Sequence, residues 1–273
     1  MTQGGKTYVN TVKTALVGVV AVASLALAAG CNNQGDAGSG SSPSPSPSPS
    51  KTLTATEQFT TAASLLRGTP YKFSLKSSSD INYDGSVDPL AGIVVGKIAV
   101  TVQGVKVSLD TQLGQNDYYV KVNGLPLPGV DTSKWFHVDP TKVTSLSAVM
   151  IGGLTDPTGV GDLAKAVGTV ESAGDKQLKG TFDFTKSTWG AAVDDKAVQE
   201  LGDKAKAVPF TAGLDDKGRL TTLKVTIPAH GADKEEVIDI TYSDFGTAVK
   251  MTPPAAADTV EAPAALYTLL NNA

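Results

Sequence analysis

The sequence has few of the residues from which enzyme active sites are usually built. Its 273 residues include one cysteine, Cys31, and two histidines, His137 and His230. No HExxH, GxSxG or GxxxxGK[S/T] motif occurs, so the patterns of zinc peptidases, serine hydrolases and phosphate loops are missing. Neighbouring acidic residues fit solvated caps and turns better than paired glycosidase carboxylates: Asp194-Asp195, Asp215-Asp216 and Glu235-Glu236. We therefore expect no enzyme, no cofactor and no metal site.

The first thirty residues predict a signal peptide that is removed after export. They contain Lys6 and Lys13, no acidic residue, and then an unbroken run of small and apolar residues from Ala15 to Gly30. This run is shorter than the ~20 apolar residues of a membrane-spanning helix. It also ends in small residues next to the cysteine, as cleaved signals do.

The residues around the cysteine predict a lipid anchor. Leu27-Ala28-Ala29-Gly30-Cys31 resembles the lipobox of bacterial lipoproteins, in which the cysteine thiol receives a diacylglycerol. A lone cysteine can instead be a buried core residue, but Cys31 lies between a signal segment and a polar linker. We expect Cys31 to hold the protein on the outer face of the cytoplasmic membrane, because two or three acyl chains anchor stably.

A polar linker separates this cysteine from the folded part of the chain. Residues 32–51 are largely Gly, Ser and Pro, and such a composition cannot bury a core. The expected organisation is a signal peptide over 1–30, a lipidated cysteine and linker over 31–53, and one domain over 54–273. Without the signal the chain keeps 21 basic and 27 acidic residues, with no basic stripe, so nucleic acid is not an expected partner.

Changes in hydrophobic period predict an α+β fold with a large antiparallel sheet. Period-2 alternation predicts strands, and helices are expected where capping signals precede apolar residues at helical spacing. The predicted strands are 71–75, 98–102, 105–113, 120–122, 168–172, 177–184, 209–214, 220–227 and 237–242, with an edge segment at 134–138. The predicted helices are 55–66, 140–150, 157–167 and 188–205, the last interrupted near Gly190 and Gly202. Short hairpin connections favour a meander.

Several short stretches, in this order, resemble the actinobacterial LppX/LprA/LprF/LprG lipoprotein family. The resemblance spans about residues 54–260, and none of the motifs is catalytic. The stretches are Leu66-Arg67-Gly68-Thr69-Pro70-Tyr71-Lys72-Phe73, Lys134-Trp135-Phe136-His137-Val138-Asp139-Pro140, Val170 through Lys179-Gly180-Thr181-Phe182-Asp183, and Ser243-Asp244-Phe245-Gly246.

The resemblance implies a fold like the lipid carrier LolA. In that fold a strongly curved antiparallel sheet, a half-barrel, holds helices on its concave face with an apolar cavity between. It further implies that acylated lipid or glycolipid is bound and carried across the envelope, with the membrane and a membrane lipid exporter as partners.

Strand alternation nominates the residues that would line such a cavity. They are Phe73, Leu75, Val100, Val102, Val107, Leu109, Val120, Val122, Leu223 and Val225. Helices rich in Ala and Gly would leave the space over this face underfilled, and an apolar void can hold acyl chains.

The same alternation would also build a solid core. In that case the domain would be a surface interaction module that binds a membrane or cell-wall partner through loops such as Gly124–Gly129. An enzyme is a more distant alternative, for which His137 would be the first residue to test.

Overall fold

The computed structural model describes residues 52–102, 104–124, 130–144, 150–186, 189 and 193–271. The predicted signal, Cys31 and most of the linker lie outside these residues, so the anchor stays a prediction. Residues Lys51–Ala273 form one compact unit. Within the described part of the chain, no helix is long and apolar enough to cross a membrane.

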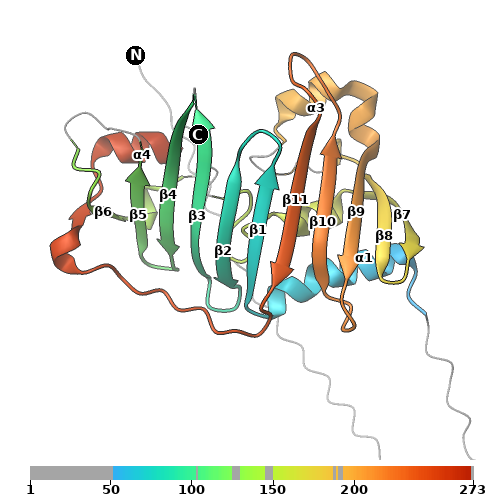
Figure 1. Cartoon of the computed structure of the whole chain (residues 1–273), viewed down its shortest axis with the longest axis horizontal. Coiled ribbons are helices and arrows are strands. Elements are labelled where there is room, and N and C mark those ends of the chain that lie inside the picture. Colours follow the sequence, from blue (N-terminus) through green and yellow to red (C-terminus); the bar gives the residue numbers. More distant parts are fainter. Residues whose placement is uncertain are drawn as a thin grey trace, which may run out of the picture. The chain divides into compact units, whose positions relative to one another are not determined.

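One open, mixed sheet of twelve strands dominates the α+β fold (Figure 1). Its order is β12-β6-β5-β4-β3-β2-β1-β11-β10-β9-β8-β7, so β12 and β7 are the edges. The strands are β1 (Tyr71–Ser77), β2 (Asn82–Asp88), β3 (Ile93–Val102), β4 (Val105–Leu113), β5 (Tyr118–Asn123), β6 (Trp135–Val138), β7 (Val167–Gly174), β8 (Gln177–Phe182), β9 (Val208–Leu214), β10 (Leu220–Ile227), β11 (Glu236–Ser243) and β12 (Thr259–Glu261).

Two antiparallel meanders, β1–β6 and β7–β11, make up this sheet. They join at its centre, where β1 pairs antiparallel with β11 and Leu75 lies opposite Ile240. The expected meander is thus present twice, and a long-range pairing merges the two. β12 adds a short parallel strand beside β6, with Val260 opposite Phe136, and makes the sheet mixed.

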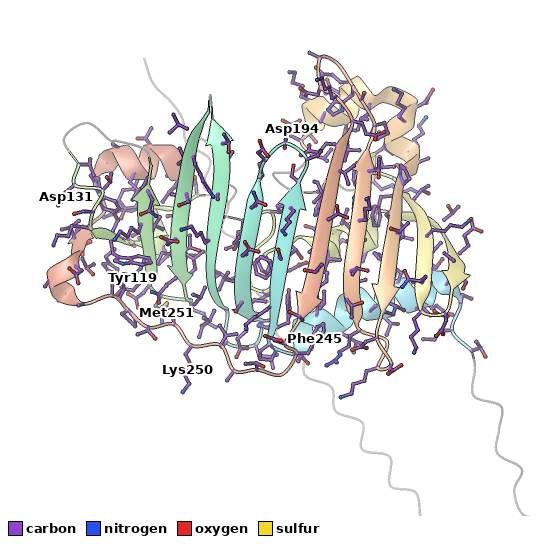
Figure 2. All side chains as sticks on the ribbon, viewed as in Figure 1. Tyr119, Asp131, Asp194, Phe245, Lys250 and Met251 are labelled. Atoms are coloured by element: carbon purple, nitrogen blue, oxygen red, sulfur yellow. The ribbon has the colours of Figure 1, made fainter. Side chains whose placement is uncertain are left out.

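The segment between β11 and β12 runs along the ends of the strands of the first meander. Phe245, Lys250 and Met251 mark its course in Figure 2. It is fastened at several points: the Arg219 guanidinium lies 4.2 Å from the Phe245 ring centre, and Thr252 N donates to Gln112 Oε1 at 2.9 Å.

In the described part of the chain, four α-helices and several 3₁₀ turns accompany the sheet. The first helix confirms the capping-box prediction, because Thr54 Oγ1 accepts from Glu57 N while the Glu57 side chain accepts from Thr54 N. Phe59, Ala62 and Ala63 form its buried face. The helices are α1 (Ala55–Leu65), α2 (Val160–Lys165), α3 (Asp195–Leu201) and α4 (Ala264–Asn271), and the 3₁₀ turns include η1 (Leu66–Gly68), η2 (Pro140–Lys142), η4 (Gly202–Ala207) and η5 (Ala256–Asp258).

Three predicted helices are wrong in extent. The helix expected over 140–150 is interrupted after the turn η2, because Val143 is extended; residues 145–149 lie outside the described chain. The Asp139-Pro140 signal specifies a first turn, and the extended backbone of Val143 ends it. The helix expected over 157–167 shortens to α2. The helix expected over 188–205 begins only at Asp195, because Trp189 and Val193 pair as a β-bridge, and it ends where Gly202 has φ +56°.

Sequence reasoning missed β2, β12 and α4. β2 has only two large apolar residues, Tyr83 and Val87, with Gly85 between them where a third would stand. α4 docks through buried Leu266 and Leu270, and its Tyr267 hydroxyl accepts from Asp139 N at 2.9 Å. These elements depend on tertiary partners, which local patterns do not reveal.

Candidate functional site: the covered face of the sheet

All ten predicted lining residues lie on one face of the sheet. Residues paired across a ladder point to the same side, so the register decides this question. Val100 pairs with Val107, Leu109 with Val122 and Leu75 with Ile240. Leu223 also pairs with Ile240, which joins the second meander to the same face. We call this the covered face, because α1 and the core lie against it; the other is the open face.

The ten residues differ in how deeply they are buried. Six have side chains at most 3% exposed: Phe73, Leu75, Val120, Val122, Leu223 and Val225. Three are half-buried: Val100, Val107 and Leu109. Val102 belongs to β3, but its side chain lies outside what the structure describes. The half-buried residues all lie toward the β3–β4 hairpin end.

In the second meander, aromatic packing closes the covered face. Phe59 of α1 lies 4.9 Å from Phe210 and 5.7 Å from Phe182, centre to centre. The Phe182 and Phe210 rings stack at 4.2 Å. All three side chains are at most 3% exposed. Because these rings fill the space beneath α1, Leu223 and Val225 belong to a packed core.

At the centre of the sheet two aromatic rings pack closely against a pair of glycines. Gly85 and Gly96 face each other across β2 and β3. A Cβ on Gly85 would lie 2.7 Å from Phe73 Cζ, and one on Gly96 would lie 2.9 Å from Tyr83 Cε2. The Phe73 and Tyr83 rings meet edge to face, with centres 4.7 Å apart. Phe73 therefore packs against the sheet itself.

Toward the end of the β3–β4 hairpin the covered face is only partly enclosed. Ile98 and Leu109, which pair across the ladder, are half-buried and still pack against the core. Val100 and Val107 are half-buried, and Val105 is 53% exposed. Figure 1 shows this hairpin extending beyond its neighbouring strands. The described chain thus carries an apolar surface from the core to the hairpin end.

A buried polar cluster holds the segment before α2 against β11. The Thr158 hydroxyl lies 3.0 Å from the Tyr242 hydroxyl, and Trp189 Nε1 donates to Thr158 O at 2.9 Å. Asp156 accepts from the backbone N–H of Val160 and Gly161, at 3.2 and 2.7 Å. Burial raises the pKa of the Asp156 carboxyl. The cluster caps α2 and holds the segment before it against β11, which is a structural role.

Two tyrosine hydroxyls on the covered face lack hydrogen-bond partners within the described chain. They belong to Tyr71 of β1 and Tyr83 of β2. Burial raises the pKa of both phenols, so neither ionises near neutral pH. A buried hydroxyl without a partner forfeits ~1–3 kcal/mol of hydration. The rings of these two tyrosines stabilise the core, whereas their hydroxyls add no hydrogen bond within the described chain.

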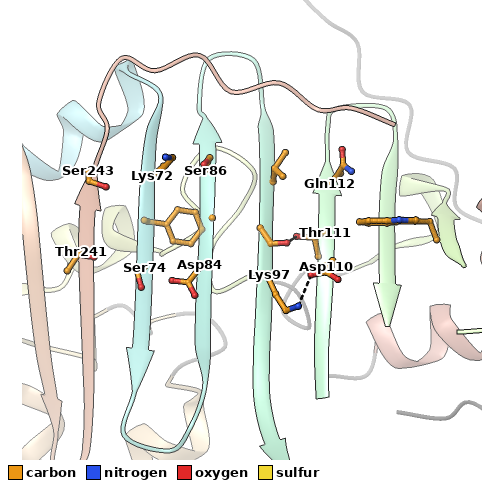
Figure 3. Close-up of a pocket in the computed structure, with 15 residues that line it drawn as sticks. Lys72, Ser74, Asp84, Ser86, Lys97, Asp110, Thr111, Gln112, Thr241 and Ser243 are labelled. Atoms are coloured by element: carbon orange, nitrogen blue, oxygen red, sulfur yellow. Dashed lines mark hydrogen bonds and ion pairs between the residues drawn. The ribbon is translucent and has the colours of Figure 1, made fainter. Parts of the chain in front are cut away.

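The open face holds a groove of about 640 Å³ over β11, β1, β2, β3 and β4, with both polar and apolar residues in its lining (Figure 3). Lys97 Nζ lies 3.3 Å from Asp110 Oδ1 within it. Trp135 contributes to the far side, and the remaining polar side chains come from alternate positions of the five strands. These are Lys72, Ser74, Asp84, Ser86, Gln112, Thr241 and Ser243, and the groove is also lined by Thr111, Phe73, Val95, Gly85 and Gly96. The polar positions that alternate along each strand look like ordinary solvated surface in the sequence, so this groove was not predicted.

His137 also lies on the open face, as its place beside buried Phe136 and Val138 predicts. Its Nδ1 lies 3.0 Å from Glu261 Oε1 and its Nε2 3.1 Å from Asp117 Oδ1. These two hydrogen bonds raise the pKa of the imidazole. The histidine therefore ties β12 to the β4–β5 turn. This arrangement explains it without catalysis.

Comparison of the sequence with models of known protein families and with curated proteins gives no match. The family resemblance therefore remains a proposal based on the short motifs and their order. The residues brought together on the covered face are what any functional assignment has to explain.

Proposed function

We propose that the domain is a non-catalytic carrier of acylated lipid or glycolipid, of the LppX/LprA/LprF/LprG type, with a LolA-like fold. The observation that carries the proposal is the continuous apolar covered face, which runs from a closed core to a partly exposed β3–β4 end. Acyl chains would enter there and lie along the Val100, Val107 and Leu109 positions. Burying each methylene stabilises the bound lipid by ~0.8 kcal/mol, so no charged group is needed.

The proposed anchor fits this role. Lipidation at Cys31 would keep the domain at the outer face of the cytoplasmic membrane, and the Ser-Pro linker would hold it away from the surface. A carrier in that place could take lipid from the membrane, or from a lipid exporter, and pass it across the envelope.

Replacement of Val107 by Trp tests the lipid site. The indole would occupy the proposed acyl position, so lipid uptake from vesicles should fall sharply. The thermal midpoint should change little, because Val107 is only half-buried and the new ring can extend toward solvent instead of into the packed core. Uptake and co-purified lipid are measured by native mass spectrometry. Lys106→Trp is the matched control. Lys106 pairs with Thr101 and is exposed on the open face, so its replacement should leave uptake unchanged.

Two results would count against the proposal. One is the absence of co-purified or vesicle-derived lipid in the unaltered protein. The other is a large loss of stability in Val107→Trp with unchanged uptake, which would mean that the site is a packed core.

The open-face groove favours a second candidate function, the surface interaction module. Its charges and hydroxyls lie beside Trp135, Phe73 and Val95, which suits a partner with both polar and apolar groups. The loop Gly124–Gly129, first considered for this role, lies mostly outside the described residues. Under this alternative, Trp135→Ala should weaken binding to isolated cell envelope while Val107→Trp does not. The reverse result supports the lipid carrier.

A further inference from the structure

The second histidine lies in a pocket far along the chain from the proposed lipid site. His230 is part of the connection between β10 and β11, in a tight turn closed by His230 N–Asp233 O and Asp233 N–His230 O hydrogen bonds of 3.1 and 2.8 Å. Gly231 allows the turn because its φ is +51°, which side chains disfavour. The turn therefore fixes His230 and Asp233 side by side.

The imidazole of His230 is held with one nitrogen engaged and the other available. Nδ1 lies 3.0 Å from Pro228 O, and since a carbonyl only accepts, Nδ1 carries the proton. Nε2 then presents a lone pair. The nearest carboxylate atom, Asp233 Oδ2, is 3.8 Å away, and Nε2 has no hydrogen-bond partner in the part of the chain that is described. The side chain is only 10% exposed, so this lone pair is poorly solvated.

A third donor reaches the same point from α3. Glu200, Asp233 and His230 each place one potential ligand atom within 4.8 Å of the other two. The Glu200 carboxylate lies directly over Gly231, where a Cβ would stand 2.3 Å from Oε2. The three side chains line one pocket of about 230 Å³.

We propose that Glu200, His230 and Asp233 bind a divalent transition-metal ion, for which Zn²⁺ fits the donor set. Zinc takes imidazole nitrogen and carboxylate oxygen at about 2.0–2.2 Å, and three protein ligands leave a fourth position for water. An Nδ1–H bonded to a backbone carbonyl is the usual outer-shell support of a metal-binding imidazole. This site is independent of the proposed lipid carrier function and departs from the expectation that the chain holds no metal.

Binding requires a modest contraction of the ligand set. Ligands around tetrahedral zinc lie about 3.3 Å apart, so the carboxylates must move inward by about an ångström. The Asp233 side chain is 76% exposed and free to adjust. Lys196 Nζ, 3.5 Å from Glu200 Oε1, now neutralises that carboxylate and competes with the ion. The bound ion would tie α3 to the β10–β11 turn.

Zinc titration of the full chain in detergent tests the proposal, with Cys31→Ser in every variant so that no thiol binds the metal. We expect calorimetry to give one site of micromolar affinity that raises the thermal midpoint. His230→Gln should weaken binding at least 100-fold. Glu200→Gln and Asp233→Asn, at exposed positions, should weaken it 10- to 100-fold, while Lys196→Gln should tighten it several-fold. His137→Gln is the matched control and should bind as the parent does.

Three results would overturn the assignment. They are no binding by the parent protein at 100 µM zinc, equal affinity in parent and His230→Gln, and loss of binding in His137→Gln instead. Circular dichroism of each variant without metal shows whether it is folded. If His230→Gln is unfolded, the Glu200→Gln and Asp233→Asn titrations decide the question.

Discussion

The two meanders of the sheet share one covered face but close it in different ways. Beneath α1 the second meander has stacked phenylalanines, with Phe182 and Phe210 4.2 Å apart and nearly inaccessible. On the covered face, the β3–β4 hairpin of the first meander has only valines toward its end, and Val100 and Val107 stay half-buried. The same strand pattern therefore supports a solid core in one region and an accessible apolar surface in the other.

This difference shows that period-2 alternation determines which face of the sheet a side chain points to, but not how tightly that side chain is packed. A strand residue points to the covered face because of its place in the pleat, whatever lies opposite. Whether the residue is packed depends on the ring or helix above it. In this chain α1 covers the second meander, because it contacts β7 and β10.

The largest expected effect contrasts the two regions directly. Phe210→Ala should reduce the free energy of unfolding by about 3–5 kcal/mol, because it leaves a cavity among rings that cannot collapse. Val107→Ala should cost less than about 1 kcal/mol, since a half-buried valine makes fewer contacts. Urea denaturation monitored by circular dichroism measures both. Equal losses would show that the hairpin end is as tightly packed as the core.

A smaller effect concerns the glycine pair between the two regions. Gly96→Ala should cost about 1–3 kcal/mol, because the new Cβ would lie 2.9 Å from both Asp84 O and Tyr83 Cε2. Gly153→Ala is the control, since no heavy atom lies within 4 Å of its added Cβ. Thermal denaturation compares them. A neutral Gly96→Ala would mean that the Tyr83 ring moves freely away from the sheet.

Removing the hydroxyl should affect stability differently in two buried tyrosines, because the Tyr242 hydroxyl contacts Thr158 and the Tyr83 hydroxyl has no partner among the described residues. Tyr242→Phe should destabilise the protein by about 1 kcal/mol, because it removes the 3.0 Å contact with Thr158. Tyr83→Phe should be neutral or stabilising, because its hydroxyl has no partner among the described residues. Chemical denaturation of both variants provides the measurement. A comparable loss in Tyr83→Phe would reveal a bound water or lipid oxygen on that hydroxyl.

The smallest expected effect depends on pH and concerns His137. Its pKa in the folded state is raised by the hydrogen bonds to Glu261 and Asp117. The stabilisation is therefore fully present below about pH 6.5, the ordinary pKa of histidine, and is lost as pH rises through the higher folded pKa. Solvent screening keeps it within about 0.2–1 kcal/mol. The stability difference between the parent and His137→Gln should be larger at pH 5.5 than at pH 8.5. An identical difference at both values would rule out this coupling.

Sequence reasoning predicted the strands and their shared face with good accuracy. Val107 is the sharpest case, because a one-residue slip in register would have turned it to the open face. It pairs with Val100 as alternation requires. The predicted α1 is also confirmed, since its capping box is a local hydrogen-bond pattern. By contrast, the helix expected after Asp139-Pro140 is broken at Val143, because a local start signal specifies the first turn and not the conformation of the residues that follow it.

Local chemistry in the sequence determined which residues alternate, where turns lie and where α1 begins, because these depend on neighbours a few positions away. Only the tertiary structure decided the rest. It joined β1 to β11, laid Phe73 and Tyr83 over the two glycines, and brought Glu200 to His230. Such contacts link residues far apart in the chain, and their free energy comes from packing and desolvation that no local pattern contains.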